Sequence, residues 1–422
     1  MIRQMRETEN IKILHCISQL PGMTGSGIYY RHLVKGLDNL GFKNALLFAE
    51  QSGCEVALPP AEKYYPIQFK NEELPFAIPG MSDEMPYEST IYSQMSPDEF
   101  AAWRQAFKKR LKEAKEEFQP DVIISHHVFM MTSIVREVFD GIPVIGISHG
   151  TDIRQVRMNP WIHEKYVTSA DELDAYFALS PTDAERLHKI FSISMDKITV
   201  TGGGFDETIF HPDLEESSNE AFNLIYAGKV SHAKGVYELA RAFPKILEQI
   251  PQSRLLIVGN ATEEQKKRII QKAGGSNHLE FTPAVRQEDY AKFLQKAHVY
   301  ILPSYYEGIA LSAIEALATR TRVVISENEN LSWLLGDIVN DSGVIDYIKL
   351  PRLENVDTPV GEDIPGFVQR IADAVVAHYH KIEADPNGKQ RSAWSLQVTN
   401  EVADHSWSGI IDEIALMIKK LI

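Results

Sequence analysis

The chain has 422 residues, of which 44% are hydrophobic and 24% are charged. This length exceeds what one hydrophobic core usually holds, so we expect two domains of about 200 residues each. The formal net charge of −15 argues against a nucleic-acid partner, because binding a phosphate backbone requires a basic surface.

The two cysteines, Cys16 and Cys54, suggest a reducing compartment and no disulfide framework. No apolar stretch is long enough to cross a bilayer, and the first ten residues lack the apolar core of a signal peptide. We therefore expect a cytoplasmic protein without a transmembrane segment.

The first predicted unit is strand, glycine-rich loop, helix and strand. Residues 11–17 form a short buried strand, the loop contains Gly22, Gly25 and Gly27, and the helix follows from Ile28. Loops of this kind lie at the carboxyl ends of parallel strands, where open α/β sheets bind ligands. Tyr30 stands where a dinucleotide fingerprint needs its third glycine, so NAD is not expected. Ordinary turn chemistry also explains the glycines.

Residues 51–97 contain many prolines, an acidic patch and few periodic segments. A loop of this length inside a compact domain is usually functional or partly disordered. We predict that it contributes to specificity for a ligand.

The next predicted helix, residues 99–118, carries a row of basic side chains. Such a helix can lie on anionic lipid. A solvated helix face is the alternative that we favour, because glutamates interrupt the positive charge. The basic residues are Arg104, Lys108, Lys109, Arg110, Lys112 and Lys115, and the glutamates are Glu113, Glu116 and Glu117.

Two further strands of the first half end in polar residues. Residues 121–127 end with His126 and His127, and residues 143–152 include His149 near their end. Histidine at a strand end can donate hydrogen bonds to hydroxyls or phosphates. One of the adjacent pair can instead be a structural histidine. Asp152 and Arg154 follow as weaker candidates for ligand binding.

A polar stretch, residues 212–220, is the predicted interdomain linker, after which a second series of strands and helices begins at residue 222. Residues 228–236 place Lys229 and Lys234 in the loop before a helix. Two ammonium groups beside the amides of a helix N-terminus can bind a diphosphate. The alternative is that both lysines are solvated surface residues.

Residues 302–318 change from a buried strand to a turn and then a helix, with Glu307 at the turn and Glu315 further on. If the helix covers most of this stretch, the two carboxylates lie roughly 12 Å apart. That distance excludes a hydrolase pair, whose carboxyl groups lie about 5 to 9.5 Å apart. It suits two contacts with one elongated ligand. Alternatively, Glu307 interacts with the helix dipole and Glu315 is a solvated helix residue.

This stretch resembles the E-x7-E signature of the retaining glycosyltransferases of family 4, which have the GT-B fold. Ala310 departs from the pattern, where the family has a second glycine. Four other sites depart as well: Gly204 replaces an asparagine, Lys229 replaces an arginine, Pro283 replaces a glycine, and Arg320 and Arg322 replace a glycine and a proline. The matching residues are Pro303, Ser304, Glu307, Gly308, Glu315, Ala316 and Ala318.

The resemblance implies an α/β protein of GT-B architecture, in which two Rossmann-like domains with parallel sheets face each other across a cleft. The first domain, residues 1–212, is expected to bind the acceptor, and the second, residues 213–404, the nucleotide sugar. The C-terminal helix, residues 405–422, is expected to cross back and pack on the first domain. A helix on a membrane surface is the alternative for that segment.

The resemblance also implies roles for individual residues. Lys229 and Lys234 stabilise the departing diphosphate, and Glu315 accepts hydrogen bonds from the ribose. His149 resembles the family's histidine in the cleft. Gly25 and Gly27 face the acceptor and the donor phosphates. The donor sugar and phosphate are held by Glu307 and by the backbone of Gly308, Ile309, Ala310 and Leu311. The candidates for acceptor binding are His126, His127, Asp152 and Arg154.

The implied activity is transfer of a hexose from a nucleotide-diphosphate sugar, with UDP as the expected nucleotide, to an acceptor hydroxyl with retention of configuration. The acceptor is a small molecule, a glycan or a lipid carrier, and a peripheral membrane contact is compatible with this activity. No D-x-D motif occurs, so neither a metal nor a cofactor is expected. The alternatives are a sugar-nucleotide epimerase, a phosphorylase, and a non-catalytic subunit that binds sugar nucleotides.

Overall fold

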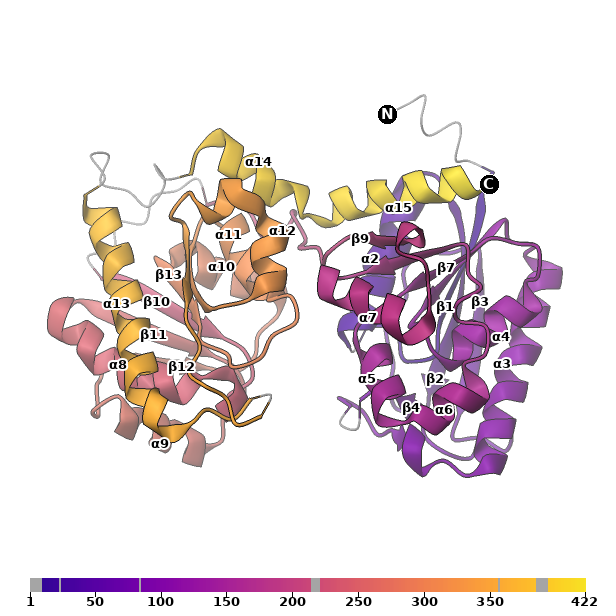
Figure 1. Ribbon diagram of the computed structural model, residues 1–422, viewed down its shortest axis with the longest axis horizontal. Helices are drawn as coiled ribbons and strands as arrows, with labels where there is room; N and C mark the ends of the chain where they lie inside the picture. The colour runs from indigo at the N-terminus through magenta and orange to yellow at the C-terminus, as the bar shows by residue number, and fades with distance from the viewer. Residues whose placement is uncertain (1–9, 23, 83–84, 214–220, 356, 385–393) are drawn as a thin grey trace. The chain divides into compact units, whose positions relative to one another are not determined.

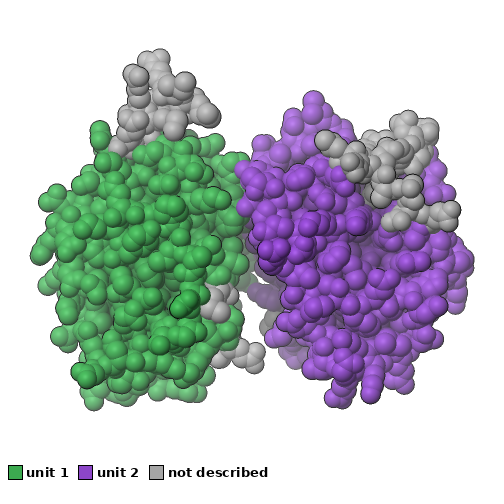
Figure 2. Space-filling view, turned by 180° about the vertical axis from the view of Figure 1, so that it is seen from behind, with its two compact units in different colours: residues 1–203, 407–422 green, residues 204–406 purple. Residues whose placement is uncertain are grey.

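The computed structural model describes residues 10–22, 24–82, 85–213, 221–355, 357–384 and 394–422. The chain divides into two compact units, which Figures 1 and 2 show. Unit 1 is Met1–Gly203 with Trp407–Ile422, and unit 2 is Gly204–Ser406. The boundaries expected from the sequence were 212/213 and 404/405. Most of the predicted linker, residues 214–220, lies outside the described residues.

Unit 1 is built on a parallel sheet, which in the described part of the chain has seven strands in the order β3-β2-β1-β6-β7-β8-β9. The central strands are buried along their whole length, as expected when helices cover both faces of a parallel sheet. The strands are β1 (Lys12–Ile17), β2 (Lys43–Gln51), β3 (Lys63–Phe69), β6 (Val122–His126), β7 (Val144–Ile147), β8 (Ala175–Ala178) and β9 (Ile198–Val200).

The segment 51–97 is more ordered than the predicted loop, and that prediction was wrong for part of it. Strand β3 pairs with β2 at the edge of the sheet, and the short strands β4 (Pro79–Gly80) and β5 (Thr90–Ile91) pair with each other. Tyr65, Ile67 and Phe69 alternate with more exposed residues, so a period-two signal was present in the sequence. Pro66 is compatible with β3 because an edge strand tolerates a residue without an N–H.

Helices surround the sheet of unit 1. Helix α3 begins with a capping box between Ser96 and Glu99, which satisfies amide groups at both positions. The helices in the first part of the chain are α2 (Gly25–Asn39), α3 (Pro97–Glu117), α4 (Met130–Val138), α5 (Thr151–Met158), α6 (Pro160–Tyr166) and α7 (Pro181–Phe191).

The basic face of α3 is partly neutralised by neighbouring acidic residues. Glu137 accepts hydrogen bonds from Arg104, at 2.6 Å, and from Lys108, at 3.0 Å. These side chains hold the pKa of the Glu137 carboxyl below its usual value, although its partial burial acts in the opposite direction.

No helix among the described residues is long and apolar enough to cross a bilayer.

The C-terminal helix α15 (Trp407–Leu421) belongs to unit 1 although it follows the whole of unit 2 in sequence, which confirms the predicted crossing back (Figure 1). It packs on α2 within a core cluster that includes residues of β1, β6 and β7. A Cβ atom at Gly36 would lie 1.9 Å from Cδ1 of Ile411. Glycine at that position therefore allows the two helices to approach closely.

Unit 2 contains a second parallel sheet, which has six strands in the described residues, in the order β12-β11-β10-β13-β14-β15. The strands are β10 (Phe222–Ala227), β11 (Ser253–Val258), β12 (Leu279–Thr282), β13 (Val299–Leu302), β14 (Arg322–Ser326) and β15 (Ile345–Ile348). The helices are α8 (Val236–Gln249), α9 (Glu263–Lys272), α10 (Gln287–Lys296), α11 (Leu311–Ala318), α12 (Glu329–Asn340), α13 (Ile364–Glu383) and α14 (Leu396–Asp404). Two parallel sheets with helices confirm the predicted fold class.

The strand order reverses once in each sheet. In unit 1 the chain proceeds outward in opposite directions from β1 and from β6, and in unit 2 from β10 and from β13. The loops that leave the carboxyl ends of the two strands at such a point turn to opposite faces of the sheet and leave a crevice between them. The fold therefore predicts one ligand-binding edge in each unit.

We expect Ile414→Ala to destabilise the protein by about 2–5 kcal/mol, because this fully buried side chain anchors α15 to unit 1. Leu416→Ala is the control, since Leu416 lies on the same helix but is 54% exposed, and its effect is expected to stay within about 0.5 kcal/mol. Chemical denaturation would measure both. Equal effects of the two substitutions would show that α15 does not pack as described.

Candidate functional site

An ion pair joins the two loops at the point in unit 2 where the strand order reverses. Nζ of Lys234 lies 2.7 Å from Oε1 of Glu307. Lys234 ends a short 3-10 helix in the loop after β10, and Glu307 lies in the loop after β13. Ser304, whose side chain is buried, donates a hydrogen bond of 2.8 Å to the same carboxylate oxygen. The structure thus brings together two residues that the sequence analysis had placed in separate motifs.

The backbone holds these two loops in contact. The amide of Tyr305 donates to the carbonyl of Ala233 at 2.9 Å. Gly235 has φ 65°, and a Cβ atom there would lie 1.9 Å from the carbonyl oxygen of Pro303. Glycine is therefore required at position 235 both by conformation and by close packing.

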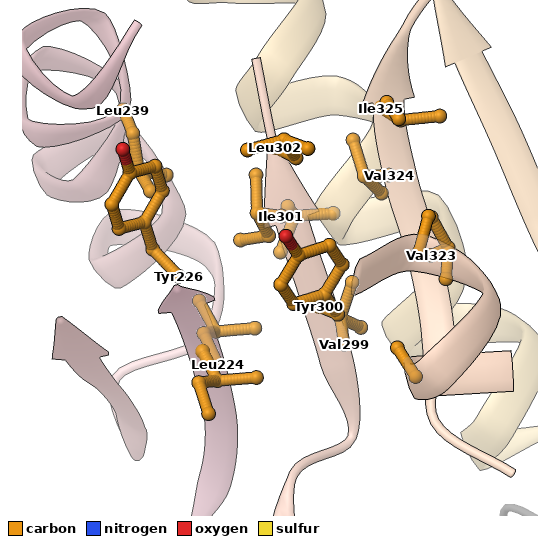
Figure 3. Packing of buried hydrophobic residues seen from close by; sticks show 14 of the residues in the cluster. Leu224, Tyr226, Leu239, Val299, Tyr300, Ile301, Leu302, Val323, Val324 and Ile325 are labelled. Carbon is orange, nitrogen blue, oxygen red and sulfur yellow. The ribbon is translucent and has the colours of Figure 1, made fainter. Parts of the chain in front are cut away.

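Two tyrosines, one on β10 and one on β13, form hydrogen bonds with the segments that follow these strands. Tyr226 donates to the carbonyl of Lys229 at 2.8 Å, and Tyr300 donates to Oγ of Ser312 at 2.7 Å. Figure 3 shows both phenol rings directed toward the carboxyl ends of their strands. Burial raises the pKa of both phenols, and the nearby charge of Glu307 also raises it, so both remain hydrogen-bond donors.

A pocket of about 330 Å³ lies beside these loops, at the carboxyl ends of β10, β11 and β12. Lys229 contributes to its wall, together with small residues, the ring of Tyr290 and two carboxamides. Volumes of about 300–1,000 Å³ are typical of small-molecule pockets. The lining residues are Ala227, Gly228, Lys229, Val258, Gly259, Asn260, Ala284, Val285, Gln287 and Tyr290.

The carboxamide of Asn260 is oriented by the backbone next to Pro283. The amide of Ala284 donates to Oδ1 of Asn260 at 3.1 Å, so this atom of the side chain must be the oxygen. The sequence analysis missed Asn260, Gln287 and Tyr290. No local motif marks them, because they lie on two separate segments, the loop after β11 and helix α10, that only the folded sheet brings together.

The loop before α11 differs from the predicted helix. Helix α11 begins at Leu311, so Glu307 lies outside it, and the separation of roughly 12 Å expected for a continuous helix does not apply. Gly308 is exposed, whereas Ala310 is buried. The amide of Leu311 already donates to the carbonyl of Ile309 at 2.8 Å. The Leu311 amide is one of the backbone groups predicted to hold the donor, but it already forms a hydrogen bond within the loop.

Glu315 lies on α11 and is partly buried. Desolvation raises the pKa of its carboxyl from 4.5 to about 7. At neutral pH both the protonated and the ionised form of this carboxyl are therefore populated. A solvated glutamate, which was the alternative from the sequence, would be ionised at that pH.

The predicted histidines of unit 1 gather at the carboxyl ends of β6 and β7. Nδ1 of His126 lies 3.1 Å from Nε2 of His149, and the two rings are stacked. The ring of His127 lies 4.9 Å from that of His149, measured between centroids. Burial lowers the pKa of all three imidazoles, that of His127 to about 3. They are therefore neutral at physiological pH.

The histidines differ in exposure. His126 and His127 are buried, whereas His149 is partly exposed. Of the three, His149 is thus the residue that a ligand reaches most directly.

Asp152 is a structural residue in this fold, which corrects its placement among the candidates for acceptor binding. Its side chain is fully buried, and it accepts hydrogen bonds from the amide of Val128 at 2.8 Å and from Oγ of Ser148 at 2.9 Å. It thereby joins the ends of β6 and β7. Burial raises the pKa of this carboxyl to about 6. Arg154, in contrast, is exposed on α5.

Gly25 and Gly27 lie in the first turn of α2 and not in a free loop, whereas Gly22 lies in the turn before the helix. Helix α2 begins at Gly25, three residues before the predicted start. The amide of Gly27 donates to Oγ1 of Thr24 at 3.1 Å, and a Cβ atom at Gly27 would lie 2.3 Å from the amide nitrogen of Gly22. Packing thus explains glycine at position 27, whereas the space around Gly25 is open.

Two family models match the chain in succession. Residues 23–208 match the model described as Glycosyltransferase Family 4, and residues 208–345 match Glycosyl transferases group 1. Each match covers less than half of the chain, and the two parts of the chain are similar to these two glycosyltransferase families. The Lys234–Glu307 pair and Glu315 fall within the second match, and the histidines within the first.

Its curated relatives are similar over part of their length. Over 239 residues the chain is 24% identical to a glycogen synthase of Mycobacterium tuberculosis, and this match covers 53% of the chain and 55% of the relative. Over 172 residues it is 28% identical to a D-inositol 3-phosphate glycosyltransferase of Arthrobacter, covering 38% and 41%. The chain thus spans about half the length of these relatives or less.

Solved structures are similar over nearly the whole chain. A sucrose-phosphate synthase from Thermosynechococcus elongatus has a TM-score of 0.65 at 16% identity, with 97% of this chain and 98% of that chain covered. The E. coli trehalose-6-phosphate structure bound with UDP-2-fluoro glucose has a TM-score of 0.65 at 10% identity, covering 97% and 99%. At these identities the similarity shows the shared GT-B fold.

The raised pKa of Glu315 predicts how stability depends on pH. The folded protein holds this proton more tightly than the unfolded chain, so the contribution of Glu315 to stability falls as the pH rises from 4.5 to about 7. At pH 8, Glu315→Gln is expected to be more stable than the wild type, because the substitution removes the cost of ionising a partly buried carboxyl. The expected difference is on the order of 2 kcal/mol, which includes a reduction because solvent screens this partly exposed side chain. The two proteins are expected to be equal at pH 4. Denaturation curves with the same difference at both pH values would contradict the shift.

Proposed function

We propose that this protein transfers a hexose from a nucleotide-diphosphate sugar, with UDP as the nucleotide, to an acceptor hydroxyl with retention of anomeric configuration. The single observation that supports this most is the Lys234–Glu307 ion pair beside the pocket that Lys229 lines. It combines positive charge for a diphosphate with a carboxylate for sugar hydroxyls in one unit of the fold.

In this proposal the two lysines stabilise the leaving group. The bond between the anomeric carbon and the phosphate oxygen breaks, the acceptor oxygen bonds to that carbon from the same face, and the acceptor proton passes to the departing diphosphate. Negative charge grows on the diphosphate as the bond breaks, and the ammonium groups of Lys229 and Lys234 offset it. Stabilisation of developing charge is often the largest catalytic contribution. Because the lysines supply this charge, the proposal requires no metal.

The carboxylates hold the donor at two points. Oε1 of Glu307 already accepts from Lys234 and Ser304, which directs Oε2 to the donor sugar. The ionised form of Glu315 accepts hydrogen bonds from the ribose hydroxyls, and the nucleoside occupies the pocket of about 330 Å³. A bound UDP sugar derivative in the similar E. coli structure supports this choice of donor.

In this proposal the histidines of unit 1 contribute to binding a sugar hydroxyl and the acceptor. As a partly exposed neutral imidazole, His149 can donate or accept a hydrogen bond with a sugar hydroxyl, and His126 sets its orientation through the bond of 3.1 Å. The names of the relatives, which include a glycogen synthase, support a hydroxyl of a carbohydrate or a similar small molecule as the acceptor.

Lys234→Ala is expected to lower turnover about 100- to 1,000-fold, because it removes charge stabilisation from the leaving diphosphate. Lys266→Ala is the matched control, since Lys266 forms an ion pair of 2.8 Å with Glu263 on the surface of unit 2. Release of UDP from UDP-glucose or UDP-N-acetylglucosamine in the presence of candidate acceptors would measure both. Full activity of Lys234→Ala would refute the proposal. Epimerised donor formed without acceptor would identify an epimerase instead.

The affinity for UDP is expected to fall as the pH decreases below about 7, because only the ionised carboxyl of Glu315 accepts from both ribose hydroxyls. Glu315→Gln is expected to bind UDP more weakly at pH 8 and with less dependence on pH. Isothermal titration calorimetry between pH 5.5 and pH 8 would measure this, at about five pH values. Parallel pH profiles of the two proteins would remove Glu315 from the ribose contact.

A further inference from the structure

Asn328 lies between β14 and α12 and contacts the loop that carries Glu307. Its Nδ2 donates to the carbonyl oxygen of Gly308 at 3.0 Å and lies 3.5 Å from that of Glu307. Its Oδ1 accepts from the amide of Leu331 at 2.8 Å and thereby caps the first turn of α12. Because the amide of Leu331 can only donate, the carboxamide is oriented with its nitrogen toward the loop.

The contact with Asn328 determines where the neighbouring amides point. A trans peptide is planar, with its carbonyl and its N–H on opposite sides. If the carbonyls of Glu307 and Gly308 face Asn328, the N–H groups of Gly308 and Ile309 face the opposite way. Neither N–H donates to a protein acceptor within the described residues. The loop therefore presents two adjacent amide donors next to the Lys234–Glu307 pair.

Packing alone does not hold the loop at this point. Gly308 is exposed, and a Cβ atom there would meet no atom within 4 Å. The side chain of Asn328 supplies the contact that packing does not. Its carboxamide is the only side-chain donor to the carbonyls of Glu307 and Gly308 in the described part of the chain.

We infer that Asn328 is a positioning residue, which orients the amides of Gly308 and Ile309 to bind the second phosphate of a nucleoside diphosphate. The inference rests on the proposed function, because it assigns those amides to the donor. Paired backbone amides bind anions well, since each supplies a fixed donor without the entropy cost of a long side chain. Asn328 acts through the loop and does not itself touch the diphosphate.

The test compares the affinities for UDP and UMP, which differ by that second phosphate. Asn328→Ser keeps an N-cap acceptor for α12 but is too short to reach the loop. We expect it to bind UDP about tenfold more weakly, the loss of roughly one charge-assisted hydrogen bond, and to bind UMP like the wild type. Asn328→Asp also keeps the cap and removes the donor, so it is expected to change the ratio of the two affinities in the same direction.

Asn340→Ser is the matched control. Asn340 lies at the other end of α12, where its Nδ2 donates to the carbonyl of Ser332 at 2.7 Å. This variant is expected to lose stability without changing the ratio of UDP to UMP affinity. A merely structural role of Asn328 would lower both affinities together or only the melting temperature.

The outcomes separate the inference from the proposed function. If the wild type binds UDP more tightly than UMP and both Asn328 variants keep that ratio, the inference is overturned and the proposed function stands. If the wild type binds neither UDP nor UDP sugars, nor the corresponding guanosine compounds, the proposed function fails and the inference fails with it. A lowered ratio in both variants with an unchanged ratio in Asn340→Ser supports the inference.

Discussion

The ion pair between Lys234 and Glu307 joins two loops that lie 73 residues apart in sequence. Both side chains are partly buried, so water screens their attraction less than it would on the surface. Partial burial also has a desolvation cost, which further hydrogen bonds must offset. Ser304 supplies one of them to the same oxygen. The glycine at 235 permits the close approach of the two loops.

The position of the ion pair follows from the topology of the sheet. Strands β10 and β13 are neighbours, and the chain leaves them toward opposite faces, so their loops bound one crevice. Unit 1 repeats the arrangement with β1 and β6. There a helix start follows β1 and the neutral His127 follows β6, in place of lysines and a glutamate. The two units thus share a framework but present different chemistry at their ligand-binding edges.

Much of this framework was predictable from local sequence. The continuous apolar runs of β6, β7 and β13 indicate strands buried on both faces, and the sequence before α3 signals its capping box. Strand β3 was missed because Pro66 and the charged residues before the strand concealed a short alternation. Asp152 was assigned to acceptor binding because the sequence does not distinguish a carboxylate that contacts a ligand from one that forms hydrogen bonds within the protein. In the structure it accepts hydrogen bonds from Val128 and Ser148.

By itself, the sequence determined which chemical groups follow the strands: the lysines at 229 and 234, the glutamate at 307, the histidine at 149, and the glutamate at 315 on the next helix. These depend on residue type and spacing, which are local. Only the tertiary structure decided that Lys234 pairs with Glu307, that Glu315 titrates near neutral pH, and that Asn328 contacts the Glu307 loop. Charge pairing and desolvation depend on neighbours from distant segments, and only the folded sheet brings those segments together.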